Sequence, residues 1–253
     1  MKLFCRLYRK ELNGSRHIFL TLLGLIMGID VFLITRISSW GYWRALQVTF
    51  LPHAFLVFWA LFRAFAITRE EWKEGTAPFL RSLPISGWGI VGAKLLAVFT
   101  EWFTLSLATV TFSGLFYAAA PLWGENWLGL TDLLFSGRAV RFMVFSGINL
   151  SLGIMLGGII FQLAYLLGRT VNRFHGLVSV ASTVLLIYIT TKGSEFLSQL
   201  FSDFLGITLE SRVFSPNEDL VLSYSLVSMV VLLIEFALLF FITGWVMEKK
   251  AES

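Results

Sequence analysis

The stretch EEWKEGTAPFLRSLPISGWGIVGAK, residues 70–94, is a polar and tightly patterned segment between two long apolar runs. The chain around it is 57% hydrophobic and 14% charged, with a mean hydropathy of +0.77. A single soluble core of 253 residues would not bury that much apolar surface. The composition therefore predicts an all-α integral membrane protein in which residues 70–94 connect two spans.

Six apolar runs approach the length of about 20 residues that a helix needs to cross the hydrocarbon of a bilayer. The runs cover residues 18–35, 48–68, 95–119, 142–167, 174–191 and 220–247. The fourth and fifth runs can also be interpreted as one helical hairpin around the basic turn GRTVNRFHG, residues 168–176. Because no internal repeat or low-complexity linker interrupts the chain, we treat residues 1–253 as a single transmembrane domain.

The distribution of Lys and Arg predicts the orientation of these spans. With the amino terminus in the cytoplasm, the inner connections carry roughly twice as many cations as the outer ones. Both termini and residues 70–94 are then cytoplasmic, and the protein is a multi-pass protein of the plasma membrane. The net charge of +4 is explained by this bias, so nucleic acid is not an expected partner. The lone Cys5 excludes an internal disulfide framework.

Two segments outside the runs have an amphipathic pattern. In MKLFCRLYRKEL, residues 1–12, apolar side chains stand opposite Lys and Arg, which predicts a helix at the membrane interface or a simple membrane anchor. In EFLSQLFSDFLGITLE, residues 195–210, six apolar residues share one helical face. This pattern predicts an outer helical segment before the last span, acting either as a lid on the span ends or as a substrate gate.

Catalytic motifs are missing from the sequence. No G-x-x-x-x-G-K-[ST] phosphate loop occurs, so ATP hydrolysis by this chain is not expected. His17, His53 and His175 are too scattered to form a metal site. An aspartyl intramembrane protease would need two membrane aspartates, and only Asp30 is available. We expect that the chain is not an enzyme and carries no cofactor.

The stretch REEWKEGTAPFLRSLPISGWGIVGAKLLA, residues 69–97, resembles the signature loop of the type-two ATP-binding-cassette (ABC) exporter permeases. The shared elements are a charged helix end, E-G-T at residues 74–76, S-L-P-I-S at residues 82–86 and K-L-L-A at residues 94–97. The chain departs from the family pattern at Ala93, where a glycine often stands, and at the extra Gly87 and Gly89. Six spans and an amphipathic amino-terminal helix are similar to the layout of that family.

The resemblance implies a permease subunit, paired with a second copy or a related permease, above two separate ATPase subunits that carry ATP and Mg. A short coupling helix in the loop would sit in a groove of the ATPase, with charges and apolar anchors orienting the contact. Pro78 and Pro84 would stop the flanking helices. The alternative is that residues 70–94 are a mere hairpin connection. The residues assigned to this partner contact are Glu70, Glu71, Lys73, Glu74, Gly75, Thr76, Phe79, Leu80, Arg81, Leu83 and Pro84.

Four ionisable residues fall within the predicted spans, namely Asp30, Arg63, Glu101 and Glu235. At about 1.5 Å of rise per residue, Arg63 and Glu101 share a depth, which predicts an ion pair between spans two and three. The alternative is that each side chain reaches the interface independently. Asp30 and Glu235 also share a depth, as carboxylates either lining a wet cavity or bonded to polar neighbours.

The four intramembrane charges favour a second function, a proton-coupled secondary transporter. A third is a non-transporting membrane module that anchors a cytoplasmic partner. The many aromatic residues suit a pathway for a hydrophobic peptide, lipid or drug, and the family resemblance implies export of a peptide, bacteriocin or drug. Glycine pairs at Gly24 and Gly28, and at Gly153 and Gly157, predict close helix contacts within one subunit or between two.

Overall fold

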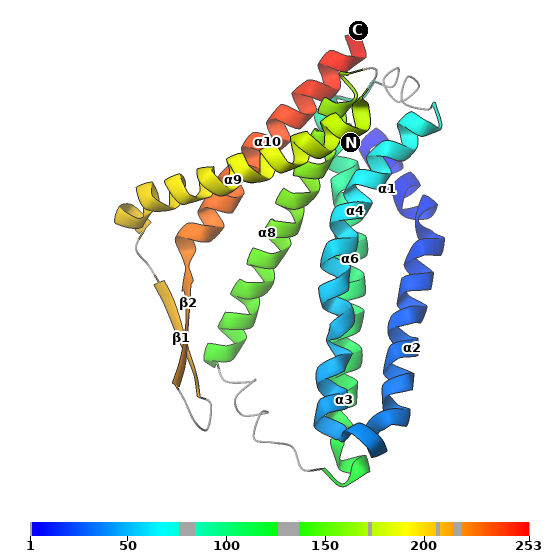
Figure 1. Ribbon diagram of the computed structural model, residues 1–253, viewed down its shortest axis with the longest axis vertical. Coiled ribbons are helices and arrows are strands. Elements are labelled where there is room, and N and C mark those ends of the chain that lie inside the picture. Colours follow the sequence, from blue (N-terminus) through cyan, green and yellow to red (C-terminus); the bar gives the residue numbers. More distant parts are fainter. Residues whose placement is uncertain are drawn as a thin grey trace.

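The computed structural model describes residues 2–75, 84–125, 137–171, 174–205, 208–214 and 219–252 (Figure 1). Within these ranges, six helical segments are long and apolar enough to cross a membrane, as the sequence predicted. The elements, in chain order, are α1 Lys2–Gly14, α2 Arg16–Trp40, α3 Tyr42–Thr49, α4 Leu51–Lys73, α6 Gly87–Ala118, the 3₁₀ turn η1 Ala120–Trp123, α8 Gly137–Gly168, α9 His175–Leu205, β1 Thr208–Phe214, β2 Asp219–Ser225 and α10 Leu226–Glu252.

Both termini lie at one end of the molecule, together with α1 and the ends of α4 and α6 that flank residues 74–86 (Figure 1). The short helix α3 lies at the opposite end. Helix α6 has the most neighbours, because it packs against α1, α2, α3, α4, α8 and α10. Helix α8 packs mainly against α4, α9 and α10.

Burial differs sharply among the six spans. In α8, 56% of the most apolar window is buried inside the chain, whereas the corresponding share is 11% in α2 and 6% in α9. Helix α9 slants away from α4 and α6 and contacts mainly α8 and α10 (Figure 1). The α2 and α9 surfaces are therefore apolar and largely free of contacts within this chain.

Three clusters of buried side chains form the core. One joins α1, α6, α8 and α10 around Leu163, and a second joins α2, α4, α6 and α8 around Leu105. The third closes the α3 end around Tyr42 and Phe116. Within the described residues, α6 is thus the only helix that contributes to all three clusters.

We call residues 74–86, which connect α4 to α6, the polar turn. The residues at its two edges explain where α4 ends and α6 begins. Gly75 follows α4 with φ at +69°, a left-handed conformation that glycine adopts without strain and that ends helices. Ser86 is the N-cap of α6, and its hydroxyl accepts a hydrogen bond from the Gly89 amide at 3.3 Å. Of the predicted helix stops, Pro84 lies two residues before this cap, and Pro78 lies outside the described residues.

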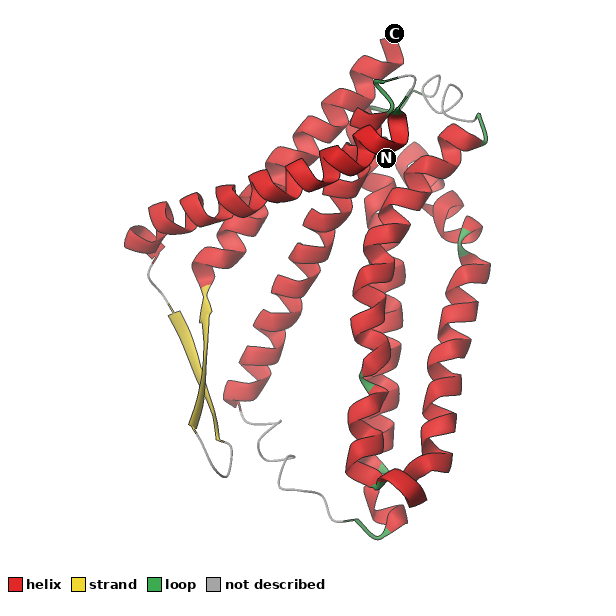
Figure 2. Cartoon of the chain, viewed as in Figure 1, coloured by secondary structure: helices red, strands yellow, loops and turns green. Residues whose placement is uncertain are grey.

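The connection between α9 and α10 differs from the prediction. The helical part of residues 195–210 is continuous with α9 as far as Leu205, so it is not a separate helix. Strands β1 and β2 then form an antiparallel hairpin in which Arg212 pairs with Val221 (Figure 2). The last span begins at Leu226, because residues 220–225 belong to β2. Among the described residues, the regular secondary structure is therefore helical apart from this one hairpin.

Candidate functional site: a buried ionic cluster

The predicted partner contact is only partly described. Glu70, Lys73, Glu74, Gly75 and Pro84 are exposed at the edges of the turn. The remaining predicted contacts, apart from Glu71, lie outside the described residues, and so does the expected coupling helix; these contacts are Thr76, Phe79, Leu80, Arg81 and Leu83.

Glu71 lies inside the protein, although the sequence suggested a surface contact. It is one of eight buried positions along α4, and only 5% of its surface is exposed. Its Oε1 atom lies 2.9 Å from Lys94 Nζ on α6 and 3.5 Å from Lys10 Nζ on α1. Its carboxylate therefore joins helices of this chain.

Lys94 is the centre of the contacts between three helices. Its Nζ donates hydrogen bonds to Glu11 Oε1 of α1 and to the Ile67 carbonyl of α4, both at 3.1 Å. The Glu71 carboxylate is a third partner, in an ion pair at 2.9 Å, so oxygen atoms from α1 and α4 surround the ammonium group. Only 2% of Lys94 is exposed, so water does not replace these contacts.

Arg63 and Glu101 lie together, as their matching depths predicted. Arg63 Nε is 3.8 Å from Glu101 Oε2, and both residues are buried. Arg63 also uses NH1 to bind Glu70 Oε1 at 3.0 Å within α4. The alternative, in which each side chain reaches the interface independently, is therefore wrong for Glu101, and Arg63 holds two carboxylates at once.

Helix α1 is tied to the same region by two hydroxyl groups. The Ser15 side chain, at the junction of α1 and α2, donates a hydrogen bond to Glu101 Oε1. The hydroxyls of Tyr8 and Thr100 lie 3.0 Å apart and form a second hydrogen bond between α1 and α6. The apolar side of α1 packs on α6 through Leu7, Phe4 and Tyr8, while its Lys and Arg residues are exposed.

We call Glu11, Ser15, Arg63, Glu71, Lys94 and Glu101 the ionic cluster. Its buried carboxylates outnumber its buried cations by one. Burying charges is costly unless each is paired, and removing one partner from a buried pair leaves a charge uncompensated at about 3–5 kcal/mol. The ionic cluster therefore constrains α1, α4 and α6 strongly at the end that carries the polar turn.

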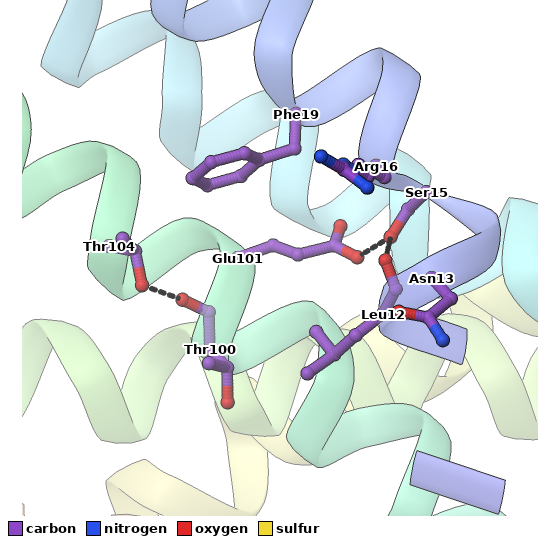
Figure 3. Close-up of a pocket in the computed structure, with 8 residues that line it drawn as sticks. All are labelled: Leu12, Asn13, Ser15, Arg16, Phe19, Thr100, Glu101 and Thr104. Atoms are coloured by element: carbon purple, nitrogen blue, oxygen red, sulfur yellow. Dashed lines mark hydrogen bonds between the residues drawn. The ribbon is translucent and has the colours of Figure 1, made fainter. Parts of the chain in front are cut away.

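A pocket of about 230 Å³ opens beside the ionic cluster, where the α1–α2 junction faces α6 (Figure 3). Glu101 reaches across this pocket between Leu12 and Phe19, and Thr100 and Thr104 line the α6 wall. Arg16 lies on the side of α2.

Asp30 and Glu235 lie on helices at opposite sides of the molecule, α2 and α10 (Figure 1). Both carboxylate oxygens of Glu235 accept from Ser194 Oγ of α9 at 2.8 Å, which agrees with the polar-neighbour alternative for this residue. One oxygen of Asp30 is buried without a hydrogen-bond partner in the described structure.

The glycine pairs also have different surroundings. A Cβ at Gly157 would collide with Leu61 of α4, so this glycine permits a close contact within the chain. A Cβ at Gly24, Gly28 or Gly153 would meet nothing within 4 Å.

Several residues of the cluster gave no recognisable signal in the sequence. Lys94 stood in a motif and looked like one more inner-side cation, and Glu11 and Ser15 had no assigned role. The only available sign for Glu71 and Lys94 was their position on faces that are otherwise apolar. The structure also explains why residue 87 is a glycine, because a Cβ there would collide with the Gly244 carbonyl of α10.

Comparison with known proteins adds no name for this arrangement: no protein-family model, no curated protein and no solved structure matches the chain.

Proposed function

We propose that the chain is the membrane-spanning permease subunit of an ATP-driven exporter, with ATP and Mg bound on a separate cytoplasmic ATPase that docks at residues 70–84. The proposal starts from the resemblance of residues 69–97 to the loop of type-two ABC permeases. The observation that carries it is the ionic cluster, which ties both flanks of that turn to each other and to α1.

The cluster matters for coupling because a docked segment transmits motion only when its flanks move as a unit. A displacement of the turn would be passed to α4 through Arg63 and Glu71, and to α6 through Lys94 and Glu101. Since buried ion pairs tolerate little separation, the three helices would shift together rather than slide past each other. Lys73 and Glu74 are exposed beside the turn and are available to orient a partner.

A hydrophobic or amphipathic substrate, such as a peptide, bacteriocin or drug, is in keeping with the apolar clefts. One of about 970 Å³ lies between α6 and α8, with Phe99, Trp102 and Phe103 on its α6 wall. A second permease copy, or a related permease, would complete the pathway, and the sparsely covered surfaces of α2 and α9 leave room for it.

Two other functions stand as alternatives to the exporter. The buried carboxylate of Glu235, held by Ser194 alone among the described residues, favours a proton-coupled secondary transporter. A non-transporting module that anchors a cytoplasmic partner would use the same turn and the same rigid flanks.

Affinity purification from native membranes in mild detergent tests the proposal. We expect a phosphate-loop ATPase to copurify with the tagged chain in roughly equal amounts. The Glu74→Arg, Phe79→Ala double variant should lose the ATPase while remaining in the membrane. The matched control is Glu195→Arg, a charge reversal at an exposed site on α9, which should retain it. Proton-driven substrate flux by the purified chain alone would instead establish the secondary transporter.

A further inference from the structure

Glu101 is the member of the ionic cluster whose charge is least compensated. Its Oε1 accepts the Ser15 hydroxyl, but its Oε2 is buried and accepts no hydrogen bond from the described residues. Arg63 Nε at 3.8 Å is too far for a hydrogen bond. The shorter contacts of the two buried cations go elsewhere, those of Arg63 to Glu70 and those of Lys94 to Glu11 and Glu71.

The Glu101 side chain lines the pocket between the α1–α2 junction and α6 (Figure 3). Glu101 is 3% exposed and extends through the middle of the pocket in this view. A buried carboxylate that lacks a donor binds a cation or an N–H donor strongly, because the low local dielectric strengthens the contact. The pocket therefore presents an acceptor suited to an ammonium group.

The opposite charge is available at the same pocket. Arg16 lines it and is exposed, and no ion pair holds Arg16 among the described residues. A guanidinium group binds phosphate through paired N–H donors. A ligand that satisfies both side chains carries an ammonium and a phosphate within one small group. Leu12 and Phe19 offer apolar contact beside these charges.

The position of the pocket selects the source of such a ligand. It lies where the amphipathic helix α1 meets α2, the first helix that is long and apolar enough to span a membrane. An amphipathic helix of this kind lies at the level of lipid headgroups. We propose that this pocket binds the headgroup of phosphatidylethanolamine, with the primary ammonium on Glu101 Oε2 and the phosphate on Arg16. This inference depends on membrane insertion and not on the exporter assignment.

The choice between headgroups follows from hydrogen bonding. The primary ammonium of phosphatidylethanolamine has three N–H donors, one of which would satisfy Glu101 Oε2. The quaternary ammonium of phosphatidylcholine has the same charge but no N–H donor, and its methyl groups need more of the 230 Å³ that the pocket provides. A lipid headgroup with a phosphate and no ammonium would bind Arg16 but would leave Glu101 Oε2 without a hydrogen-bond donor.

Native mass spectrometry of the full chain tests the proposal. The protein is equilibrated in micelles with equal amounts of phosphatidylethanolamine, phosphatidylcholine and phosphatidylglycerol that have identical acyl chains. We expect the most tightly retained lipid to be phosphatidylethanolamine, by about tenfold over phosphatidylcholine. Equal retention of these two lipids, or a stronger preference for phosphatidylglycerol, would overturn the proposal.

Variants test whether the preference for phosphatidylethanolamine arises at this pocket. Glu101→Gln removes the charge that attracts the ammonium and should bring the tenfold preference to about unity, whereas Glu195→Gln, at an exposed position on α9 outside the pocket, should preserve it. Because Glu101→Gln also alters the ionic cluster, Thr104→Trp provides a second test at an exposed wall position. Its indole should fill the pocket and abolish the preference in a folded protein. A preference that survives Thr104→Trp would place the lipid elsewhere and contradict the proposal.

Discussion

The two ends of α6 are held to their neighbouring helices by different forces. At the end with the polar turn, the contacts are those of the ionic cluster, centred on Lys94. At the α3 end, the contacts are aromatic: the ring of Tyr42 lies 5.3 Å from that of Phe116 and 5.9 Å from that of Trp123. We call these the ionic end and the aromatic end.

The difference shows which end can respond to a partner. Aromatic packing depends on burial and shape, so the aromatic end has one preferred arrangement that charge or ligand changes alter little. The ionic end depends on a balance of charges in which Glu101 is only partly compensated. A docked partner or a bound headgroup can shift that balance. The comparison therefore places sensitivity to charge at the ionic end, and packing that is insensitive to charge at the aromatic end.

Removing the central cation should break the ionic end most severely. Lys94→Met removes the buried counter-charge that Glu11 and Glu71 share and leaves them the exposed Lys10, at 4.0 and 3.5 Å, so we expect a loss of about 3–5 kcal/mol in the free energy of unfolding. Denaturant titration in mixed micelles measures it. The matched control, Lys192→Met, removes an exposed pair with Glu195 and should cost less than about 1 kcal/mol. Equal losses in the two variants would contradict the central role of Lys94.

A steric change tests a different contact beside the ionic end. The Trp88 ring of α6 lies against Gly244 of α10, where a Cβ would collide with it. Gly244→Ala should therefore cost about 1–3 kcal/mol through overpacking. Gly24→Ala meets nothing within 4 Å and should stabilise α2 by about 0.5–1 kcal/mol, because alanine favours helix. Thermal unfolding of both variants checks the opposite signs, and a stabilised Gly244→Ala variant would refute the close contact.

The aromatic end should be the less sensitive to loss of a polar group. The Tyr42 hydroxyl donates a hydrogen bond to the Phe116 carbonyl, so Tyr42→Phe should cost about 1 kcal/mol while the ring packing remains. Tyr188→Phe, at an exposed tyrosine of α9, is the control and should change nothing measurable. A Tyr42→Phe loss as large as that of Lys94→Met would remove the contrast between the two ends.

Hydropathy and charge alone predicted much of the fold. The six spans follow from run lengths, and the proximity of Arg63 and Glu101 follows from their matching depths. The hairpin was missed because residues 220–225 continue the apolar run of α10, and hydropathy does not separate a short strand from the start of a helix.

The site was harder to predict than the fold. Lys94 on α6 and Glu71 on α4 are buried where α1 and α4 pack on α6, and no local pattern in the sequence specifies which helices pack together. The Ser15–Glu101 hydrogen bond joins residues 86 positions apart, a pairing that depends on the same packing. The partner contact at Phe79, Leu80, Arg81 and Leu83 stays a prediction.

A pair of double-mutant cycles tests most directly whether buried charges hold α4 to α6 across the turn. One cycle combines Arg63→Gln with Glu101→Gln, and the other combines Arg63→Gln with Glu70→Gln. The Glu101 pair joins two helices and is buried, while the Glu70 pair is partly exposed and lies within α4. Despite its longer distance, the Glu101 pair should show the larger coupling, about 1–3 kcal/mol against less than about 1 kcal/mol for Glu70. A coupling with Glu101 that is zero, or smaller than that with Glu70, would contradict the account.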